Sequence, residues 1–377
     1  MRFFNKEKIF TKRQKEYIIA KERKNKMEKT VCELFAGVGG FRVGLEKADT
    51  NWETVWANQW EPGKKSQHAY DCYIKHFGNE SKYVNKDISS VDKSIIPNHN
   101  LLVGGFPCQD YSVARTGAKG IAGKKGVLWW QIRDTLEAKK PKFVLLENVD
   151  RLLKSPANQR GRDFGVILAC FNDLGYTVEW RVINAADYGL AQRRRRTFIF
   201  ACKNDTEYYQ NIKKSSLEKI IQKEGFFIKE FPIHINIDST EIEFKYKDLM
   251  DVSDNFKMEF KNSGVMLNGK IYTTEVTPIQ IDAKPLIKII EHNGVDEKDI
   301  IRKKGTPHEY HFREGAIAFP DRLDKPARTM LTSEGSLNRS THVIEDPKSK
   351  CYRILTPIET ERINGFPDDW TNTGMPE

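Results

Sequence analysis

The stretch ELFAGVGGFRVGL, Glu33 to Leu45, joins an apolar run to an amphipathic segment through a turn that contains three glycines. TVCELFA before the turn predicts a strand, and GGFRVGLEKA after it predicts a helix. Gly37, Gly39 and Gly40 let the backbone approach a ligand closely, and the start of the helix offers free N–H groups. The pattern is typical of a site for a nucleotide-type cofactor, although many strand–helix turns are merely tight.

Working outward from this turn, short apolar runs alternate with longer amphipathic segments up to about residue 202. Further strands are predicted at TVWANQW, NLLVGGF, FVLLENV, YTVEWRVI and TFIFAC. Helices are predicted at SQHAYDCYIKHF, LWWQIRDTLEAKK and DFGVILACFNDLG. This alternation predicts an α/β fold with a mainly parallel sheet covered on both faces. Ligands of such folds bind beyond the carboxyl ends of the strands.

The remainder of the chain has a different texture, and a length of 377 residues favours two domains. Residues 203–350 are rich in Lys, Asp, Asn and Thr and predict a second, mostly β domain with long loops. Within it, Asn268-Gly269 in VMLNGKIYTT predicts a two-residue hairpin turn. Residues 351–377 form a return segment after it.

The charge of the chain points to a polyanionic partner. The formal net charge is +10, and residues 1–30 supply +7 of it, with eleven Lys or Arg against four Glu. Such a balance favours nucleic acid, with an anionic membrane surface as the alternative. The segment 1–30 is either a solvated helical extension or an arm that binds nucleic acid.

Cysteine spacing and hydropathy indicate the cellular compartment in which the protein is expected. The six cysteines are scattered without CxxC spacing, which indicates neither a zinc site nor a disulfide framework. No signal-peptide pattern and no apolar run long enough to cross a membrane is visible in the sequence. We therefore expect a cytoplasmic protein.

Two further strand ends carry side chains suited to a nucleoside. Gln59 and Trp60 end the second predicted strand, where a polar group that binds ribose and a ring that stacks on adenine are expected. Asp87-Ile88 ends a third short strand, and its carboxylate can accept a hydrogen bond from an adenine amino group. Taken singly, Trp60 is also explained as a core residue and Asp87 as a cap.

The stretch GGFPCQDYS, Gly104 to Ser112, places a cysteine behind a proline at the end of an apolar run. Two glycines release the backbone, and Pro107 fixes its own φ angle and favours an extended Phe106. A stiff loop of this kind presents Cys108 as a nucleophile. The alternative is a buried, inert cysteine.

These strings together resemble the cytosine-C5 DNA methyltransferase family, which uses S-adenosylmethionine. The resemblance rests on LFAGVGGFRVGL, GGFPCQDYS, VLLENV and QRRRRTFIF, and it covers roughly residues 31–202 and 326–370. It implies a Rossmann-like methyltransferase domain over 31–202 and a smaller, mostly β target-recognition domain over 203–350. RILTPIETERINGFPDDW, residues 353–370, resembles the family motif that packs the two domains together.

The resemblance also implies roles for individual residues. Cys108 corresponds to the nucleophile that adds to carbon-6 of cytosine, and Glu147 to the group that binds or protonates ring N3. Arg194 and Arg196 correspond, by the same resemblance, to the family's two arginines near the flipped base. Alternate residues of a strand point to opposite faces, so Arg193 and Arg195 are expected to face away from them. DNA contacts are expected from Ser112, Arg193, Arg195 and Thr329, and residues 114–126 correspond to a mobile loop. The cofactor residues implied are Phe35, Ala36, Gly37, Gly39, Gly40, Gln59, Trp60, Asp87, Ile88, Pro107 and Leu128.

The sequence departs from the family pattern at two places. The ribose-binding position, usually acidic, is Gln59, which predicts weaker or altered contact with the cofactor. The closing Gly-Asn-(Ser/Ala)-Val motif does not appear before the chain stops at NTGMPE. This predicts either a truncated product or a small partner subunit that supplies the motif to an otherwise monomeric chain. His308 and His311 lack further ligands at suitable spacing, so no metal site is expected.

The sequence therefore predicts an enzyme that flips a cytosine out of a specific duplex DNA sequence and methylates its carbon-5, as part of a restriction-modification or self-protection system. Two alternatives stay open. One is a tRNA cytosine-5 methyltransferase that shares these motifs, and the other is a DNA-binding form or subunit that is inactive alone.

Overall fold

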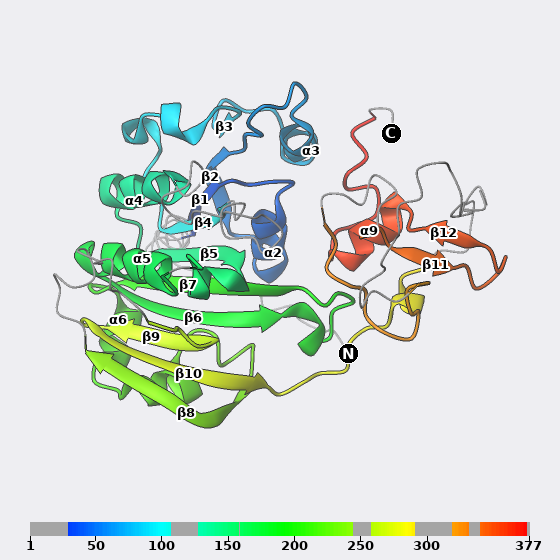
Figure 1. Cartoon of the computed structure of the whole chain (residues 1–377). Coiled ribbons are helices and arrows are strands. Elements are labelled where there is room, and N and C mark those ends of the chain that lie inside the picture. Colours follow the sequence, from blue (N-terminus) through cyan, green and yellow to red (C-terminus); the bar gives the residue numbers. More distant parts are fainter. Residues whose placement is uncertain are drawn as a thin grey trace, which may run out of the picture.

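The computed structural model describes residues 29–106, 127–157, 159–243, 258–290, 319–331 and 340–374. In Figure 1 a large twisted sheet with flanking helices occupies the left and centre, and a smaller unit lies to the right. Some predictions concern residues outside the described ranges, namely most of the charged extension, Pro107, Cys108, Ser112, the loop 114–126, His308 and His311.

The large sheet has ten strands in the order β3-β2-β1-β4-β5-β7-β6-β9-β10-β8. Its strands are β1 (Thr30–Leu34), β2 (Glu53–Asn58), β3 (Tyr83–Val84), β4 (Leu101–Gly105), β5 (Phe143–Val149), β6 (Tyr176–Asn184), β7 (Arg195–Lys203), β8 (Ile233–Glu243), β9 (Ser263–Leu267) and β10 (Lys270–Pro278). The first five strands in this order are parallel, while β7 is antiparallel to both β5 and β6. The carboxyl ends of β1 to β5 and the start of β7 therefore share one edge.

Helices cover both faces of the sheet, as the alternating pattern predicts. They are α2 (Gly40–Ala48), α3 (His68–Phe77), α4 (Val127–Lys139) and α5 (Arg162–Asp173). Leu34, Leu102 and Leu146 pack in the core cluster that includes residues of α4 and α5. Val31 and Val103 point the other way and pack with Phe41 and Leu45 of α2. This period of two is what a strand buried on both faces requires. The predicted α/β class is confirmed.

The predicted hairpin is also present. β9 and β10 pair antiparallel from Leu267 and Lys270 outward. Asn268 and Gly269 between them have φ angles of 52° and 75°, the left-handed region that a two-residue turn of this type demands.

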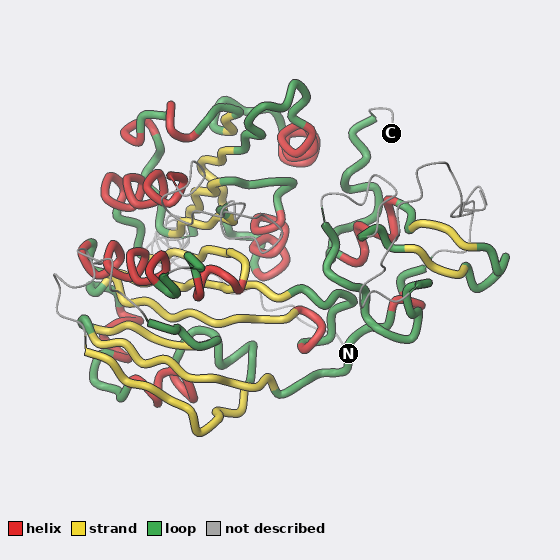
Figure 2. The backbone as a smooth tube through the Cα atoms, in the orientation of Figure 1, coloured by secondary structure: helices red, strands yellow, loops and turns green. Residues whose placement is uncertain are grey.

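The sheet does not end at the predicted domain boundary near residue 203. β9 pairs with β6, and β10 and β8 follow outward, so residues 233–278 extend the large sheet (Figure 2). Gly264 makes the β6–β9 pairing possible, because a Cβ atom there would lie 2.0 Å from the Trp180 ring.

The smaller unit has its own core and its own small sheet. It contains the 3₁₀ turn η7 (Leu286–Lys288), the antiparallel strands β11 (Val343–Glu345) and β12 (Tyr352–Ile354), and helix α9 (Pro357–Ile363). Its core joins Leu286, Ile289, Ile344, Leu355 and Ile363.

Helix α9 starts with a complete set of N-terminal signals. Thr356 caps the Glu359 N–H, Glu359 returns a bond to the Thr356 N–H, and Pro357 occupies the first turn. The buried Glu359 carboxylate also pairs with Arg353 of β12 at 2.9 Å. The cap therefore ties the helix to the hairpin. No helix within the described ranges is long and apolar enough to cross a bilayer.

Candidate active site

The candidate site lies along the shared edge of the large sheet, where loops from several strands meet. Residues 35–40 follow β1, Gln59 and Trp60 follow β2, and residues 85–87 follow β3. Gly105 ends β4, Glu147 lies near the end of β5, and Arg196 lies near the start of β7. The structure thus places these residues along one edge of the sheet.

The glycine turn has the strained geometry that its sequence allows. Phe35, Gly37 and Gly39 all have positive φ angles, of 54°, 57° and 90°. The Ala36 N–H donates to Asn58 O at 2.9 Å, and the Gly37 N–H donates to Gln59 Oε1 at 2.7 Å. A Cβ atom at Gly37 would meet nothing within 4 Å, so the turn is open on that side. Gly40 is the first residue of α2.

The backbone of Gln59 is held by hydrogen bonds at both its N–H and its carbonyl. Its N–H donates to Val84 O at 3.1 Å, and its carbonyl accepts from Asn85 Nδ2 at 2.9 Å. With Oε1 engaged by the Gly37 N–H, its amide nitrogen is the group available to a ligand. Trp60 is 38 % exposed, so it is not a core residue.

Asp87 and Ile88 occupy different environments. Asp87 is exposed and its Oδ1 accepts from the N–H and the hydroxyl of Ser89, which makes it the cap of a short 3₁₀ turn. Ile88 is 2 % exposed and belongs to the main core. Leu128 of α4 is half-buried and packs against the same core.

These residues fit a nucleoside cofactor. An open glycine position, an exposed indole and a side-chain amide with a free donor nitrogen lie on consecutive loops at one edge. Such an arrangement suits the backbone approach, ring stacking and hydroxyl recognition that a nucleoside needs.

A buried carboxyl lies beneath this turn. Glu33 of β1 is fully buried and its Oε2 accepts from the Tyr73 hydroxyl of α3 at 3.0 Å. Burial raises the pKa of the Glu33 carboxyl to about 7, although the Tyr73 hydroxyl and the Arg42 guanidinium act in the opposite direction. Glu33 therefore links the start of the turn to α3.

Glu147 and Arg196 form an ion pair at the centre of the edge. Arg196 Nε lies 2.8 Å from Glu147 Oε1, and their side chains are only 18 % and 24 % exposed. A second bond runs from Arg196 Nη1 to Arg195 O at 2.7 Å. The pair comes from two neighbouring strands, so its geometry is fixed by the β5–β7 pairing.

The end of β4 is shaped to accept this carboxylate. A Cβ atom at Gly105 would lie 3.2 Å from Glu147 Oε2, and one at Gly104 would lie 2.7 Å from Leu34 O. Asn148, which is buried, donates from Nδ2 to Phe106 O at 3.2 Å. The Glu147 carboxyl therefore contacts the backbone three residues before Cys108, and Asn148 holds the residue that follows Gly105.

The four arginines alternate as their position before a strand predicts. Arg193 and Arg195 are exposed, whereas Arg194 and Arg196 are half-buried. Arg195 Nε lies 3.3 Å from Asp150 Oδ2, in a pair whose side chains are 60 % and 44 % exposed.

Thr329 contacts this arginine segment. Its hydroxyl donates to Arg193 O at 2.5 Å, and the backbones of Arg193 and Ala327 are joined by a bond of 2.8 Å. The segment that contains Ala327 and Thr329 is thus attached directly to the residues that precede β7. A DNA contact of Thr329 stays a prediction.

Sequence reasoning missed several residues of this edge. Asn85 and Asp150 gave no signal, because an isolated polar residue at a strand end has many explanations. Trp370, in the quoted GFPDDW, was not singled out, yet its indole N–H donates to Val38 O of the glycine turn at 2.9 Å.

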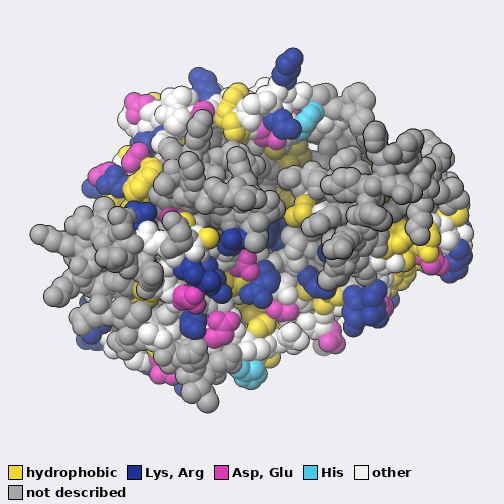
Figure 3. Space-filling view, in the orientation of Figure 1, with side chains coloured by type: hydrophobic (Ala, Val, Ile, Leu, Met, Phe, Trp, Pro, Cys, Tyr) yellow, Lys and Arg dark blue, Asp and Glu magenta, His cyan; other side chains and the backbone are white. Residues whose placement is uncertain are grey.

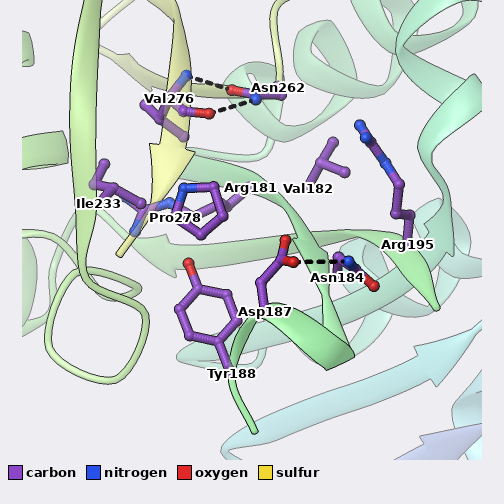
Figure 4. Close-up of a pocket in the computed structure, with 10 residues that line it drawn as sticks. All are labelled: Arg181, Val182, Asn184, Asp187, Tyr188, Arg195, Ile233, Asn262, Val276 and Pro278. Carbon is purple, nitrogen blue, oxygen red and sulfur yellow. Dashed lines mark hydrogen bonds between the residues drawn. The ribbon is translucent and has the colours of Figure 1, made fainter. Parts of the chain in front are cut away.

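A small cavity of about 50 Å³ lies beside the arginine segment (Figure 4). Asn184 and Asp187 line it and are hydrogen-bonded to each other, with Tyr188 and Arg195 around them. It is too small for a nucleoside, since sites for such ligands are several times larger.

The charge of the visible face is mixed. Figure 3 shows Lys and Arg side chains interspersed with Asp and Glu, rather than a uniform basic field. Within the described segments, no group of three or more His, Cys, Asp or Glu residues is arranged to hold a metal ion.

Comparison with known proteins identifies relatives of the whole chain. The family model for C-5 cytosine-specific DNA methylases matches residues 29–375. The Type II methyltransferase M.Sau3AI of Staphylococcus aureus is 51 % identical over 370 residues, covering 92 % of this chain and 89 % of its own length. M.HhaI of Haemophilus parahaemolyticus is 35 % identical over 173 residues, about half of each chain.

Two solved structures share the fold. The Dnmt2 methyltransferase of S. pombe has a TM-score of 0.56 at 15 % identity and covers 90 % of this chain and 88 % of its own. The Entamoeba histolytica methyltransferase EhMeth has a TM-score of 0.57 at 18 % identity, covering 92 % of this chain and 89 % of its own. The predicted Rossmann-like methyltransferase fold is confirmed.

The relatives bear on the predicted partner and on the non-enzymatic alternative. M.Sau3AI matches 92 % of this chain over 89 % of its own length. This match does not support the predicted small partner subunit. The family model and M.Sau3AI both favour the enzyme over an inactive DNA-binding form. The chain belongs to the C-5 cytosine-specific DNA methylase family and is a DNA (cytosine-5) methyltransferase.

Proposed function

We propose that this enzyme transfers a methyl group from S-adenosylmethionine to carbon-5 of cytosine in a specific duplex DNA sequence, as the methylase of a Type II restriction-modification system. The system assignment rests on M.Sau3AI, a Type II methyltransferase with 51 % identity across 92 % of this chain.

One observation carries the chemical proposal. The Glu147–Arg196 pair lies at the sheet edge, its carboxyl approaches Gly105, and Gly105 lies three residues before Cys108. A nucleophile, a carboxyl group and a guanidinium close together are what addition to a pyrimidine ring requires.

In the proposed reaction the Cys108 thiolate forms a bond to carbon-6 of the cytosine ring. Glu147 binds ring N3 and supplies a proton or hydrogen bond there, while Arg196 holds the Glu147 carboxyl and faces the O2 side of the ring. Arg194, two residues before Arg196, is proposed to support the same base. Carbon-5 then takes the electrophilic methyl group that bound S-adenosylmethionine supplies. A base removes the proton from carbon-5, the Cys108 thiolate leaves carbon-6, and ring N3 returns its proton to Glu147, which restores the ring and the enzyme.

The cofactor is proposed to lie along the loops that follow β1, β2 and β3. The backbone of Gly37, Gly39 and Gly40 approaches it, with Phe35, Ala36, Pro107 and Leu128 around it. The Gln59 amide nitrogen donates to a ribose hydroxyl, Trp60 stacks on the adenine, and Asp87 and Ile88 bind the adenine edge. The exposure of Trp60 and the open face of Gly37 support this arrangement.

The DNA is proposed to approach the same edge. A cytosine inside a duplex is out of reach of a thiolate, so it must be flipped out at a cost of a few kcal/mol. Arg193 and Arg195, which are exposed, and Ser112 are the proposed contacts to the DNA around the flipped nucleotide. Thr329 and the rest of 203–350 are proposed to read the sequence.

The experiment is transfer of labelled methyl from S-adenosylmethionine to mixed-sequence duplex DNA by the full chain, followed by nucleoside analysis for 5-methylcytosine. We expect transfer that is lost in Cys108→Ser. Transfer to RNA and not to DNA would overturn the proposal in favour of a tRNA methyltransferase. Methylation at another ring position, or full activity of Cys108→Ser, would overturn the mechanism.

A second arm tests whether this chain shares the recognition sequence of M.Sau3AI. DNA that M.Sau3AI has already methylated to completion serves as the substrate, with unmodified DNA as the matched control. If the two enzymes share a site, the premethylated DNA accepts no further methyl groups. Undiminished transfer would show that this chain recognises a different sequence.

A further inference from the structure

The segment after α9 runs back to the large sheet and contacts the glycine turn. Phe366 approaches Gly40, where a Cβ atom would lie 3.7 Å from its ring. The buried Trp370 donates its indole N–H to Val38 O at 2.9 Å. This indole is therefore a hydrogen-bond donor to the turn that comes from another part of the chain.

The Val38–Gly39 peptide is held at both ends. Its carbonyl accepts from Trp370, and its N–H, that of Gly39, donates to Ala36 O at 2.9 Å. Because a peptide unit is planar, these two bonds fix its orientation and with it the direction of the adjoining N–H groups.

The turn lacks the support that usually fixes the start of a helix. The N-cap of α2 is Gly39, in the left-handed region at φ 90°, and no side chain caps the helix. A glycine here has more conformational freedom than any other residue, so contacts from outside must hold the turn. Phe77 supplies one such contact, with its ring 2.5 Å from the position of a Gly39 Cβ atom.

Trp370 itself is fixed by α3. Its ring stacks on His76, with centroids 3.7 Å apart and planes 3° from parallel. Its carbonyl accepts from His76 Nε2 at 2.6 Å and from Cys72 Sγ at 3.3 Å. The residue that follows, Thr371, bonds Glu361 of α9 through its N–H at 2.6 Å. An indole held in this way can impose a position on the turn.

We propose that Trp370 is a positioning residue for the cofactor turn, which orients the N–H groups of residues 37–40 before S-adenosylmethionine binds. This inference rests on the proposed function of the turn. Trp370 does not touch the reacting atoms and acts through Val38.

The test measures cofactor binding and turn mobility rather than activity. Trp370→Phe keeps an aromatic ring over His76 and removes the donor, and replacement of the indole by the isosteric benzothiophene removes the N–H alone. Trp52→Phe is the matched control, because Trp52 packs against the cluster of Val31, Leu101 and Val103 and, within the described residues, makes no hydrogen bond to the turn. Calorimetry gives the Kd for S-adenosylmethionine, and hydrogen exchange of residues 35–41 is followed in the protein without cofactor.

We expect both Trp370 replacements to raise the Kd by about five- to tenfold, the loss of one well-placed hydrogen bond. Exchange of residues 35–41 accelerates, while DNA affinity and melting temperature stay at the values of the unmutated chain. An unchanged Kd would overturn this inference and leave the proposed function intact. A fall in DNA affinity and melting temperature that accompanies the change in Kd would also overturn it, because Trp370 would then act on the whole fold. Failure of the unmutated chain to bind S-adenosylmethionine would instead overturn the proposed function, and the inference with it.

Discussion

Arg196 Nε lies 2.8 Å from Glu147 Oε1, across the antiparallel pairing of β5 with β7. Both residues lie near the carboxyl edge of the sheet, next to the position proposed for the cytosine ring. The distance is that of a charge-assisted hydrogen bond. The Glu147 carboxylate therefore has one oxygen fixed by Arg196, and Oε2 lies against Gly105.

Replacement of Glu147 by glutamine tests the role of this carboxyl. The Glu147→Gln side chain keeps the shape, but it loses the carboxylate charge that Arg196 binds and can no longer exchange a proton with ring N3. We expect kcat to fall by about 100-fold or more, within the range for loss of a general acid. Single-turnover methyl transfer to duplex DNA is the measurement.

The control for this experiment is Asp150→Asn, which breaks the neighbouring pair with Arg195. That pair is long and exposed, at 3.3 Å with side chains 60 % and 44 % exposed, so its loss is expected to change kcat by less than about twofold. Equal effects of the two substitutions would show that the Glu147–Arg196 pair is no more than a strand contact.

Gln59 offers a gain-of-affinity prediction. Its Oε1 accepts from the Gly37 N–H at 2.7 Å, which leaves a neutral amide nitrogen toward the proposed ribose. In Gln59→Glu the bond from Gly37 is kept and the second carboxylate oxygen accepts from ribose hydroxyls with charge assistance. We expect the Kd for S-adenosylmethionine to fall by about three- to tenfold. Calorimetry is the measurement, and a weaker Kd in Gln59→Glu would place the ribose elsewhere.

Thr329 provides a test of the connection between the segment proposed to read the DNA sequence and the strand that carries Arg196. Its hydroxyl donates to Arg193 O at 2.5 Å. Thr329→Val removes this donor at constant shape, and we expect kcat/KM for DNA to fall by about fivefold. Thr329→Ser keeps the donor and should retain nearly full activity. The Kd for S-adenosylmethionine should stay constant in both, and a change there would show that the effect spreads through the fold.

Stability should depend on pH through Glu33. Burial raises the pKa of this carboxyl from its ordinary value of 4.5 to about 7 in the folded protein. Between these values the folded state holds a proton that the unfolded state has lost, so the free energy of unfolding falls as pH rises. The loss is complete above pH 7 and amounts to roughly 3 kcal/mol.

The measurement is urea unfolding of the unmutated chain and of Glu33→Gln, at one pH near 4.5 and at one above 7. The difference between the two proteins removes the contribution of the other titrating groups. Glu33→Gln should show the smaller loss of stability with rising pH. Glu80→Gln, whose carboxylate pairs with Lys82 and is 54 % exposed, is the control and should behave like the unmutated chain.

The sequence predicted the first half of the fold well, for reasons visible in particular residues. Leu34, Leu102 and Leu146 belong to apolar runs of strand length, whose alternate residues pack on opposite faces of the sheet. Asn268-Gly269 permits only a narrow set of turns. The extension of the sheet by β8 to β10 was not predictable in this way. The β6–β9 pairing depends on Gly264 meeting the Trp180 ring, a contact between residues far apart in the chain.

The same limit applies to the site. Strand geometry predicted that exposed and half-buried arginines would alternate between residues 193 and 196. The ends of the predicted strands predicted the positions of Gln59 and Glu147. The contacts of Thr329 with Arg193 and of Trp370 with Val38 did not, because each joins segments whose relative placement is set by packing alone. Asp87 matched the simpler explanation as well, since it caps a 3₁₀ turn.

The bond between Trp370 and Val38 spans 332 positions of the chain. During synthesis the glycine turn emerges from the ribosome early, long before its indole partner is made. Closing so long a loop is slow and comes late in folding. A nascent chain that has already formed β1 and α2 therefore still lacks a fully ordered turn. With the role proposed for Trp370, the cofactor site is complete only after the segment following α9 has been translated and has returned to α3.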